Sequence, residues 1–316
     1  MNNIIKNSII LILLLLILFS CQNNNNEPKY ITNYNCVILD NDKYIFNSNG
    51  LICQKDNIIY YSDYFDGFKI KMLDIKKNTS SQDLTDIDGK YIYGRNLMIF
   101  SDKLFYIEYS KINSIFSLCE FNLKTLKNKK IIKGLSETTH NTIISPNKNY
   151  YYFDDYFFGY GYIDLNSPDK LNRVDKIMTG IANNKSVFID SSGIFFDDEL
   201  KYKIDNLDIY TNSCLINNNY LYMPTFTIDY KIYRYDLKEN LLENIYQTVL
   251  TSHCELITVF NNEIYLLKDD EVLKYNIANK SSEIISFKSA NGIIFISNTD
   301  NKIYFIKNEK IEIITK

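Results

Sequence analysis

The chain has 316 residues, a formal net charge of only −3 and 15% aromatic residues, which include 27 tyrosines and no tryptophan. This balanced charge argues against a nucleic-acid-binding protein, because such a protein needs a strongly basic surface. Glycine and proline are scarce, at 10 and 4 residues. The abundance of Asn, Ile, Lys and Tyr would also follow from an AT-rich genome, so composition alone indicates no function.

The first predicted element is an export signal. Lys6 precedes an uninterrupted apolar run over residues 9–19, which leads through Ser into Cys21. The run is shorter than the roughly 20 apolar residues of a membrane-spanning helix, and it has the charged start and small-residue exit of a signal peptide. These residues resemble the signal peptide and lipobox of bacterial lipoproteins. The resemblance implies a signal peptide over 1–20, a lipid on Cys21 and a polar tether over 21–30, with an ordinary secretory signal as the alternative.

A lipidated Cys21 predicts a location as well. Each acyl methylene buried in a bilayer contributes about 0.8 kcal/mol, so several chains on one cysteine hold a protein firmly at a membrane surface. We therefore expect a cell-envelope protein that is lipid-anchored and faces the extracytoplasmic side. The sequence does not specify which membrane leaflet carries it.

The cysteines do not indicate a disulfide framework. The chain has six cysteines, and an odd number without CxxC spacing is left once the lipidation site is set aside. Cys119 shares its strand parity with Phe121, so we expect it to be a small core residue. A bridge between Cys36 and Cys53 stays open.

Residues 31–316 are organised as repeats of one element, in which Asn or Lys is followed by apolar, aromatic and apolar residues. Strand alternation accompanies each copy, and no segment of the mature chain keeps a helical period over three turns. The steps between copies are 46, 46, 37, 34, 43 and 30 residues, which is the range of β-propeller blades. The copies begin at Asn57, Lys103, Asn149, Ser186, Tyr220, Glu263 and Ile293.

The repeats predict an all-β fold, a β-propeller of four-stranded blades. A unit of about 40 residues cannot bury both of its faces alone, whereas copies stacked in a ring can. We expect seven blades, with six as the alternative because residues 164–207 are irregular. The last copy is one strand short, while Lys43–Asn47 is a strand left over before the first blade. We therefore expect an N-terminal strand to pair into the last blade and close the ring.

Four segments connect these repeats to a known group. Residues 57–62 (NIIYYS) and 68–75 (FKIKMLDI), with their counterparts over 262–266 and 274–277, resemble the YWTD-like and TolB-like propellers of secreted and lipid-anchored bacterial proteins. The resemblance spans most of the mature chain and implies the fold. It implies almost nothing about chemistry, because propellers include binders, lyases and assembly factors.

One face of the propeller is the predicted ligand-binding surface. Propeller geometry gathers the loops between second and third strands, and the links between blades, on a common face. Aromatic rings beside carboxylates can stack on sugar rings or peptide side chains and also hydrogen-bond to them. The alternative is that these rings pack under the loops. The candidate binding residues are Tyr64, Phe65, Asp66, Phe68, Asp155, Tyr156, Phe157, Tyr160 and Tyr230.

A catalytic alternative rests on the two histidines of the chain. His140 and His253 stand nine and ten residues before the aromatic strands of their blades, and Arg95 has a similar place in the second blade. Histidines at the channel mouth can act as a general base or as metal ligands, and the arrangement resembles that of some propeller lyases. No third metal ligand is fixed by spacing, and GxSxG and HExxH motifs do not occur. A surface or hydrogen-bonded role for both histidines is favoured.

We therefore expect a monomeric, lipid-anchored envelope protein that binds a protein or a glycan through the aromatic loop face. An envelope assembly scaffold is one alternative, and a polysaccharide-active lyase or hydrolase that uses His140 and His253 is another. The sequence favours a binding protein over an enzyme. It predicts no cofactor, no metal and no nucleic-acid partner.

Overall fold

The structure is a computed structural model, and the predicted signal peptide, the lipidation site Cys21 and most of the tether lie outside the residues it describes. Within the described part, no helix is long and apolar enough to cross a membrane. The described residues are 30–31, 34–40, 43–77, 80–110, 115–135, 140–145, 150–155, 159–168, 170–182, 185–190, 192–197, 199–204, 207–209, 213–217, 219–226, 229–249, 254–260, 262–269, 271–285, 291–297 and 302–314.

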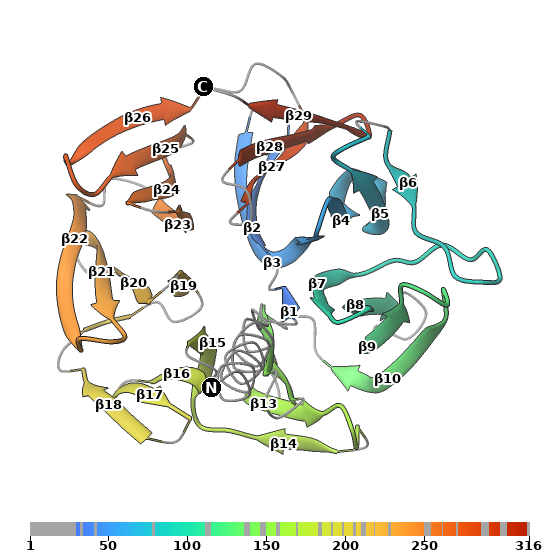
Figure 1. Ribbon diagram of the computed structural model, residues 1–316, viewed down its shortest axis with the longest axis horizontal. Helices are drawn as coiled ribbons and strands as arrows, with labels where there is room; N and C mark the ends of the chain where they lie inside the picture. Colours follow the sequence, from blue (N-terminus) through green and yellow to red (C-terminus); the bar gives the residue numbers. More distant parts are fainter. Residues whose placement is uncertain are drawn as a thin grey trace, which may run out of the picture.

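Seven antiparallel four-stranded blades stand in a closed ring (Figure 1). The first three blades follow the chain in order. Blade one contains β3 (Lys43–Lys55), β4 (Ile58–Asp63), β5 (Lys69–Asp74) and β6 (Gln82–Asp83). Blade two contains β7 (Arg95–Phe100), β8 (Lys103–Ser110), β9 (Ile115–Asn122) and β10 (Asn128–Leu135). Blade three contains β11 (His140–Ser145), β12 (Tyr150–Asp155), β13 (Gly159–Asp164) and β14 (Leu171–Arg173).

The remaining blades complete the ring. Blade four contains β15 (Ile177–Ala182), β16 (Lys185–Asp190), β17 (Gly193–Phe196) and β18 (Glu199–Lys203). Blade five contains β19 (Leu215–Asn217), β20 (Tyr220–Phe226), β21 (Asp229–Asp236) and β22 (Leu241–Val249). Blade six contains β23 (Cys254–Phe260), β24 (Glu263–Lys268), β25 (Glu271–Asn276) and β26 (Ser281–Ile285). Blade seven contains β2 (Tyr34–Asp40), β27 (Gly292–Ser297), β28 (Lys302–Lys307) and β29 (Lys310–Ile314).

The ring closes through the N-terminal strand β2, which lies between β27 and β3 and joins blades seven and one into one sheet. Cys36 of β2 pairs with Phe295 of β27. The predicted closure is thus confirmed, but the closing strand is Tyr34–Asp40 rather than Lys43–Asn47. The latter segment forms the first part of the 13-residue β3 and pairs with β2 as a hairpin. The short strand β1 (Tyr30–Ile31) pairs with β7 of blade two.

Blade four lies within residues 164–207, the irregular stretch that left six blades open as an alternative. Its third strand, β17, has only four residues, and Asp190 makes the tight turn that leads into it by accepting backbone hydrogen bonds from Ser192 and Gly193. A short strand gives few alternating positions from which a repeat can be detected. The structure includes this blade and so has seven blades and not six.

The aromatic strands are buried on both faces because each blade is covered by a neighbour on either side. In β4, Ile59 and Tyr61 are fully buried in the cluster shared with blade seven, while Tyr60 is buried in the cluster shared with blade two. Burial on both faces explains why these strands are continuous apolar runs and do not alternate. A 3-10 turn, η1 (Tyr64–Asp66), follows the aromatic strand of blade one.

A polar turn ends the third strand in several blades. The side chain of Asp74 accepts hydrogen bonds from the backbone N–H groups of Lys76 and Lys77. Such Asx turns give the backbone a local alternative to the strand ladder and so fix the hairpin. The same turn is made by Asn122, Asp164, Asp236 and Asn276.

The cysteines behave mainly as core residues. Cys119 and Phe121 are fully buried in the same cluster, as their strand parity predicted. Cys53 is also buried and has a free thiol, so the bridge to Cys36 is not formed. Burial raises the pKa of the Cys53 thiol, which keeps it protonated and unreactive.

Candidate binding site on the blade-one loop

The loop between β4 and β5 is built around the single turn η1. The carboxylate of Asp63 caps this turn by accepting a hydrogen bond of 3.0 Å from the backbone N–H of Phe65. Gly67 and Phe68 then follow with φ angles of 61° and 66°. A left-handed conformation is open to glycine but strained for a bulky L-residue such as Phe68. The loop therefore holds one aromatic residue in a backbone conformation that it would not adopt alone.

The ring of Tyr64 contacts two other aromatic rings of the loop. The ring of Tyr64 lies edge-on to Phe65 and to Phe68, with ring centres 5.3 and 5.8 Å apart. Tyr64 and Phe68 are half-buried against the core cluster between blades one and seven. Phe65, by contrast, is 46% exposed. Two rings thus anchor the loop to the core, and the third faces solvent.

Arg95 adds a positive charge to these rings from the neighbouring blade. Its guanidinium lies 4.8 Å from the ring centre of Phe68 and 5.9 Å from that of Phe116, within the range of a cation–π interaction. Gly94, the residue before Arg95, is held in place as well, because its carbonyl accepts a 2.6 Å hydrogen bond from the buried hydroxyl of Ser62. We call Tyr64, Phe65, Phe68 and Arg95 the loop surface.

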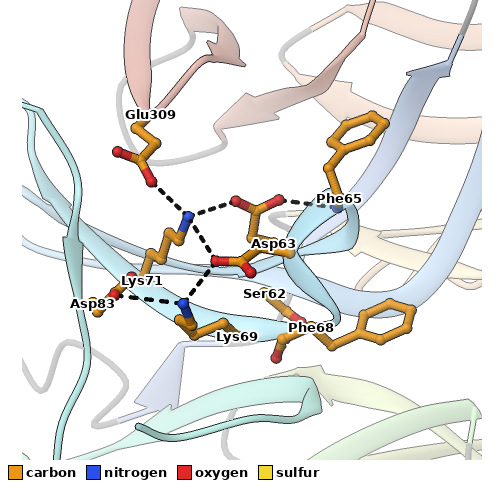
Figure 2. Close-up of polar contacts among 9 residues, drawn as sticks. Ser62, Asp63, Phe65, Phe68, Lys69, Lys71, Asp83 and Glu309 are labelled. Carbon is orange, nitrogen blue, oxygen red and sulfur yellow. Dashed lines mark hydrogen bonds and ion pairs between the residues drawn. The ribbon is translucent and has the colours of Figure 1, made fainter.

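A buried lysine fastens this loop to the last blade (Figure 2). The ammonium of Lys71 lies 2.8 Å from Asp63, 3.3 Å from Asp66 and 2.8 Å from Glu309, and the Lys71 side chain is only 4% exposed. Burial disfavours its charged form, but the hydrogen bonds from Lys71 to Asp63 and Glu309 outweigh burial and raise the pKa of Lys71. Lys71 therefore stays charged and holds both loop carboxylates against blade seven.

Lys69 completes the network on the outer side. Its ammonium lies 2.9 Å from Asp66 and 3.6 Å from Asp83. The hydrogen bond from Lys69 lowers the pKa of the Asp66 carboxyl. The two lysines thus pair with the carboxylates of the loop, while the loop surface consists of three aromatic rings and a guanidinium. Among the described residues, no group of three or more His, Cys, Asp or Glu side chains is placed to hold a metal ion.

Two further predicted binding residues, Tyr160 and Tyr230, lie in other blades than this loop. Tyr160 is half-buried in β13 of blade three. Tyr230 is fully buried between blades five and six, and burial raises its pKa. Its ring packs in the core, which is the alternative that the sequence left open for the aromatic loops. Tyr156, Phe157 and the side chain of Asp155 lie outside the described part of the chain.

The catalytic alternative stays a prediction. The backbone of His140 begins β11 and pairs with Asp154 of β12, but its side chain is not among those described, and neither is any part of His253. Arg95, the third member of that alternative, contacts Phe68 and Phe116 of the loop region.

Lys71 and Glu309 are the residues of this site that sequence reasoning missed. Lys71 shares a strand with the repeat motif, and its parity alone would make it an ordinary polar position. Glu309 lies 238 residues further along the chain. A contact over such a separation leaves no local signal, and only the closure of the ring brings the two residues together.

One comparison with a solved structure supports the fold. No protein-family model matches the chain, and no curated protein matches it. A chain in the crystal structure of the mitotic checkpoint complex aligns with a TM-score of 0.51 and 9% identity, over 93% of this chain and 95% of that one. Oligopeptidase B from Leishmania major aligns with a TM-score of 0.47 and 9% identity, over 86% of this chain and 45% of that one.

An oligogalacturonate lyase from Vibrio parahaemolyticus gives a TM-score of 0.37 and 13% identity, over 88% of this chain and 90% of that one. At 9% identity, the likeness to the chain of the mitotic checkpoint complex shows a shared fold alone. The protein is a seven-bladed β-propeller.

Proposed function

We propose that this β-propeller is a binding protein that recognises a protein or glycan ligand through the loop surface. The observation that carries the proposal concerns Phe68. Its backbone has a φ of 66°, and its ring lies beneath the guanidinium of Arg95. A left-handed conformation in a bulky residue costs about 1–3 kcal/mol, and such strain concentrates at functional sites. The Phe68 ring on this backbone lies 4.8 Å from the guanidinium of Arg95.

The composition of the loop surface supports the same proposal. Tyr and Arg are enriched among the residues that dominate binding energy at protein interfaces, and aromatic rings also stack on sugars. Phe65 is exposed and rests against Tyr64, so its side chain loses little conformational freedom on binding. A pre-ordered aromatic surface of this kind favours recognition.

We further propose that the protein acts at the cell envelope. Lys6, the apolar run over 9–19 and Cys21 support a lipid anchor, with the propeller as a monomer on the extracytoplasmic side of a membrane. The repeats support membership of the YWTD-like or TolB-like type. The anchor would concentrate the loop surface near ligands of the envelope.

The test is a binding screen of full-length protein in detergent against glycans and envelope proteins. Phe65→Ala removes the exposed ring, and Leu200→Ala in blade four is the matched control, because Leu200 is 48% exposed. We expect a ligand whose binding is lost in Phe65→Ala and retained in Leu200→Ala, with equal circular dichroism for both variants. A ligand that binds Phe65→Ala as well as the unchanged protein would refute the loop surface as its site.

A further inference from the structure

A second candidate site lies in a groove between blades three and four, away from the loop surface. The groove has a volume of about 420 Å³, which is within the range of about 300–1,000 Å³ that is typical of small-molecule sites. Residues of the sheet of blade three, a residue of β16 and the link between the blades form its walls. The lining residues are Tyr150, Tyr152, Tyr162, Val174, Asp175, Lys176 and Phe188.

Tyrosine rings and hydroxyls dominate this groove. Tyr150 and Tyr162 stack with ring centres 4.3 Å apart at an angle of 18°, and both are half-buried. Tyr152 lies opposite Tyr162 across the strands and meets Phe188 of blade four edge-on. Burial, followed by the neighbouring Tyr150, raises the pKa of the Tyr162 hydroxyl. The tyrosines thus offer neutral hydroxyl donors and acceptors next to aromatic carbon.

The charges at the rim of the groove oppose each other. Asp175 is exposed and Lys176 is half-buried, and both belong to the link between the blades. The ammonium of Lys176 lies 3.9 Å from the ring centre of Phe195, which holds it at the rim. One carboxylate and one ammonium leave the groove without net charge, so its electrostatics favour a neutral ligand with many hydroxyls over an ionic one.

Blade five shows that the blade architecture does not require this arrangement. There Tyr222 pairs with Arg234, as Tyr152 pairs with Tyr162 in blade three. The guanidinium of Arg234 lies 4.6 Å from the ring centre of Tyr220 and forms an ion pair with Glu243. An arginine in an ion pair therefore stands in blade five where Tyr162 stands in blade three.

We propose that the groove between blades three and four binds a neutral hexopyranose unit of a glycan. The apolar face of such a sugar would lie against the rings of Tyr150 and Tyr162, while its hydroxyls reach the tyrosine hydroxyls, Asp175 and Lys176. This site is separate from the loop surface and does not depend on it.

The experiment is calorimetric titration of the full-length protein, in a detergent without a sugar headgroup, with cellotetraose, mannotetraose, chitotetraose, glucose and the anionic tetragalacturonate. We expect at least one neutral tetrasaccharide to bind. If the hexopyranose unit belongs to a glycan and not to a free sugar, glucose should bind more weakly than that tetrasaccharide. Tyr162→Ala should weaken binding about tenfold, the size expected when one aromatic contact is lost. Asp175→Asn, at an exposed position, should weaken it as well, and Tyr220→Ala in blade five should leave it unchanged.

Several results would overturn the proposal. They are binding by none of the neutral sugars, a neutral sugar that binds Tyr162→Ala and Asp175→Asn as tightly as the unchanged protein, and preferential binding of tetragalacturonate. A sugar whose binding depends on Phe65 alone would also overturn the groove, while supporting the loop surface. Loss of binding in the groove variants with Phe65→Ala unaffected would support the groove independently of the loop surface.

Discussion

The ammonium of Lys71 in blade one lies 2.8 Å from a carboxylate oxygen of Glu309 in blade seven. This contact joins the two blades between which the ring closes. The same ammonium binds Asp63, which precedes the aromatic residues of the loop between β4 and β5 (Figure 2). A second contact supports it, because the backbone N–H of Ser81 donates a 2.8 Å hydrogen bond to the carbonyl of Glu309. Ring closure and the shape of the loop surface are therefore coupled through one side chain.

Replacing Lys71 with Met should destabilise the protein. The loss of one partner from a buried ion pair costs about 3–5 kcal/mol when the other charge stays buried; we expect about 2 kcal/mol here, because Glu309 and Asp66 can turn toward solvent. Urea unfolding measures the change. Lys77→Met is the control, since the Lys77 side chain is 73% exposed and its pair with Asp74 should contribute little. Equal midpoints for the two variants would contradict the structural role of Lys71.

Acid should release the loop through Asp66. Its pKa is lowered below the usual 3.8, first by the hydrogen bond from Lys69. A carboxyl with a depressed folded pKa stabilises the protein above its unfolded pKa and loses that contribution as the pH falls through the folded value. The unchanged protein should therefore exceed Asp66→Asn in stability at pH 6 and lose this advantage progressively below pH 3.8. An advantage over Asp66→Asn that stays constant down to pH 2 would rule out this linkage.

A buried hydrogen bond near the closing strand gives a third prediction. The hydroxyl of Ser297 in blade seven donates a 2.8 Å hydrogen bond to the side-chain oxygen of Gln54 in blade one, and both residues are almost completely buried. Ser297→Ala leaves that oxygen without this donor, which should cost about 1–3 kcal/mol. Thermal and urea unfolding would measure the loss.

The double variant tests the cause of that loss. Adding Gln54→Leu to Ser297→Ala removes the stranded oxygen, and replacing both partners by apolar groups can be nearly neutral. We expect the double variant to be closer to the unchanged protein than the sum of the two single effects predicts. Strict additivity would indicate that the two side chains do not interact.

The sequence predicted the parts of this fold that repeat. The aromatic strands at Asn57, Lys103 and Glu263 form the second strand of their blades, because a strand covered on both faces must be apolar throughout and leaves a recognisable run. Closure by an N-terminal strand was also predictable from the missing strand in the last copy. The identity of that strand was not, since Lys43–Asn47 and Tyr34–Asp40 are both apolar and aromatic, and only the register of the sheet separates them.

The candidate site was predictable in part. The loop residues Phe65 and Phe68 were identified from their position between two strands, and they do lie in contact with Tyr64 or Arg95. Tyr230 has the same sequence context, yet its ring is buried. A loop boundary does not specify on which side of the chain a ring lies, because one residue of register turns it from solvent to core.

Two glycines, Gly193 in blade four and Gly67 in blade one, separate the effects of packing from those of backbone conformation. A Cβ at Gly193 would overlap the backbone carbonyl oxygen of Tyr202 in the next strand, whereas a Cβ at Gly67 meets nothing within 4 Å but requires a φ of 61°. Gly193→Ala should therefore force β17 and β18 apart and cost about 3 kcal/mol. Gly67→Ala should cost only about 1–2 kcal/mol of backbone strain. Urea unfolding of both variants measures the difference. A midpoint for Gly193→Ala at or above that of Gly67→Ala would mean that the close approach of β17 to β18 does not require a glycine at position 193.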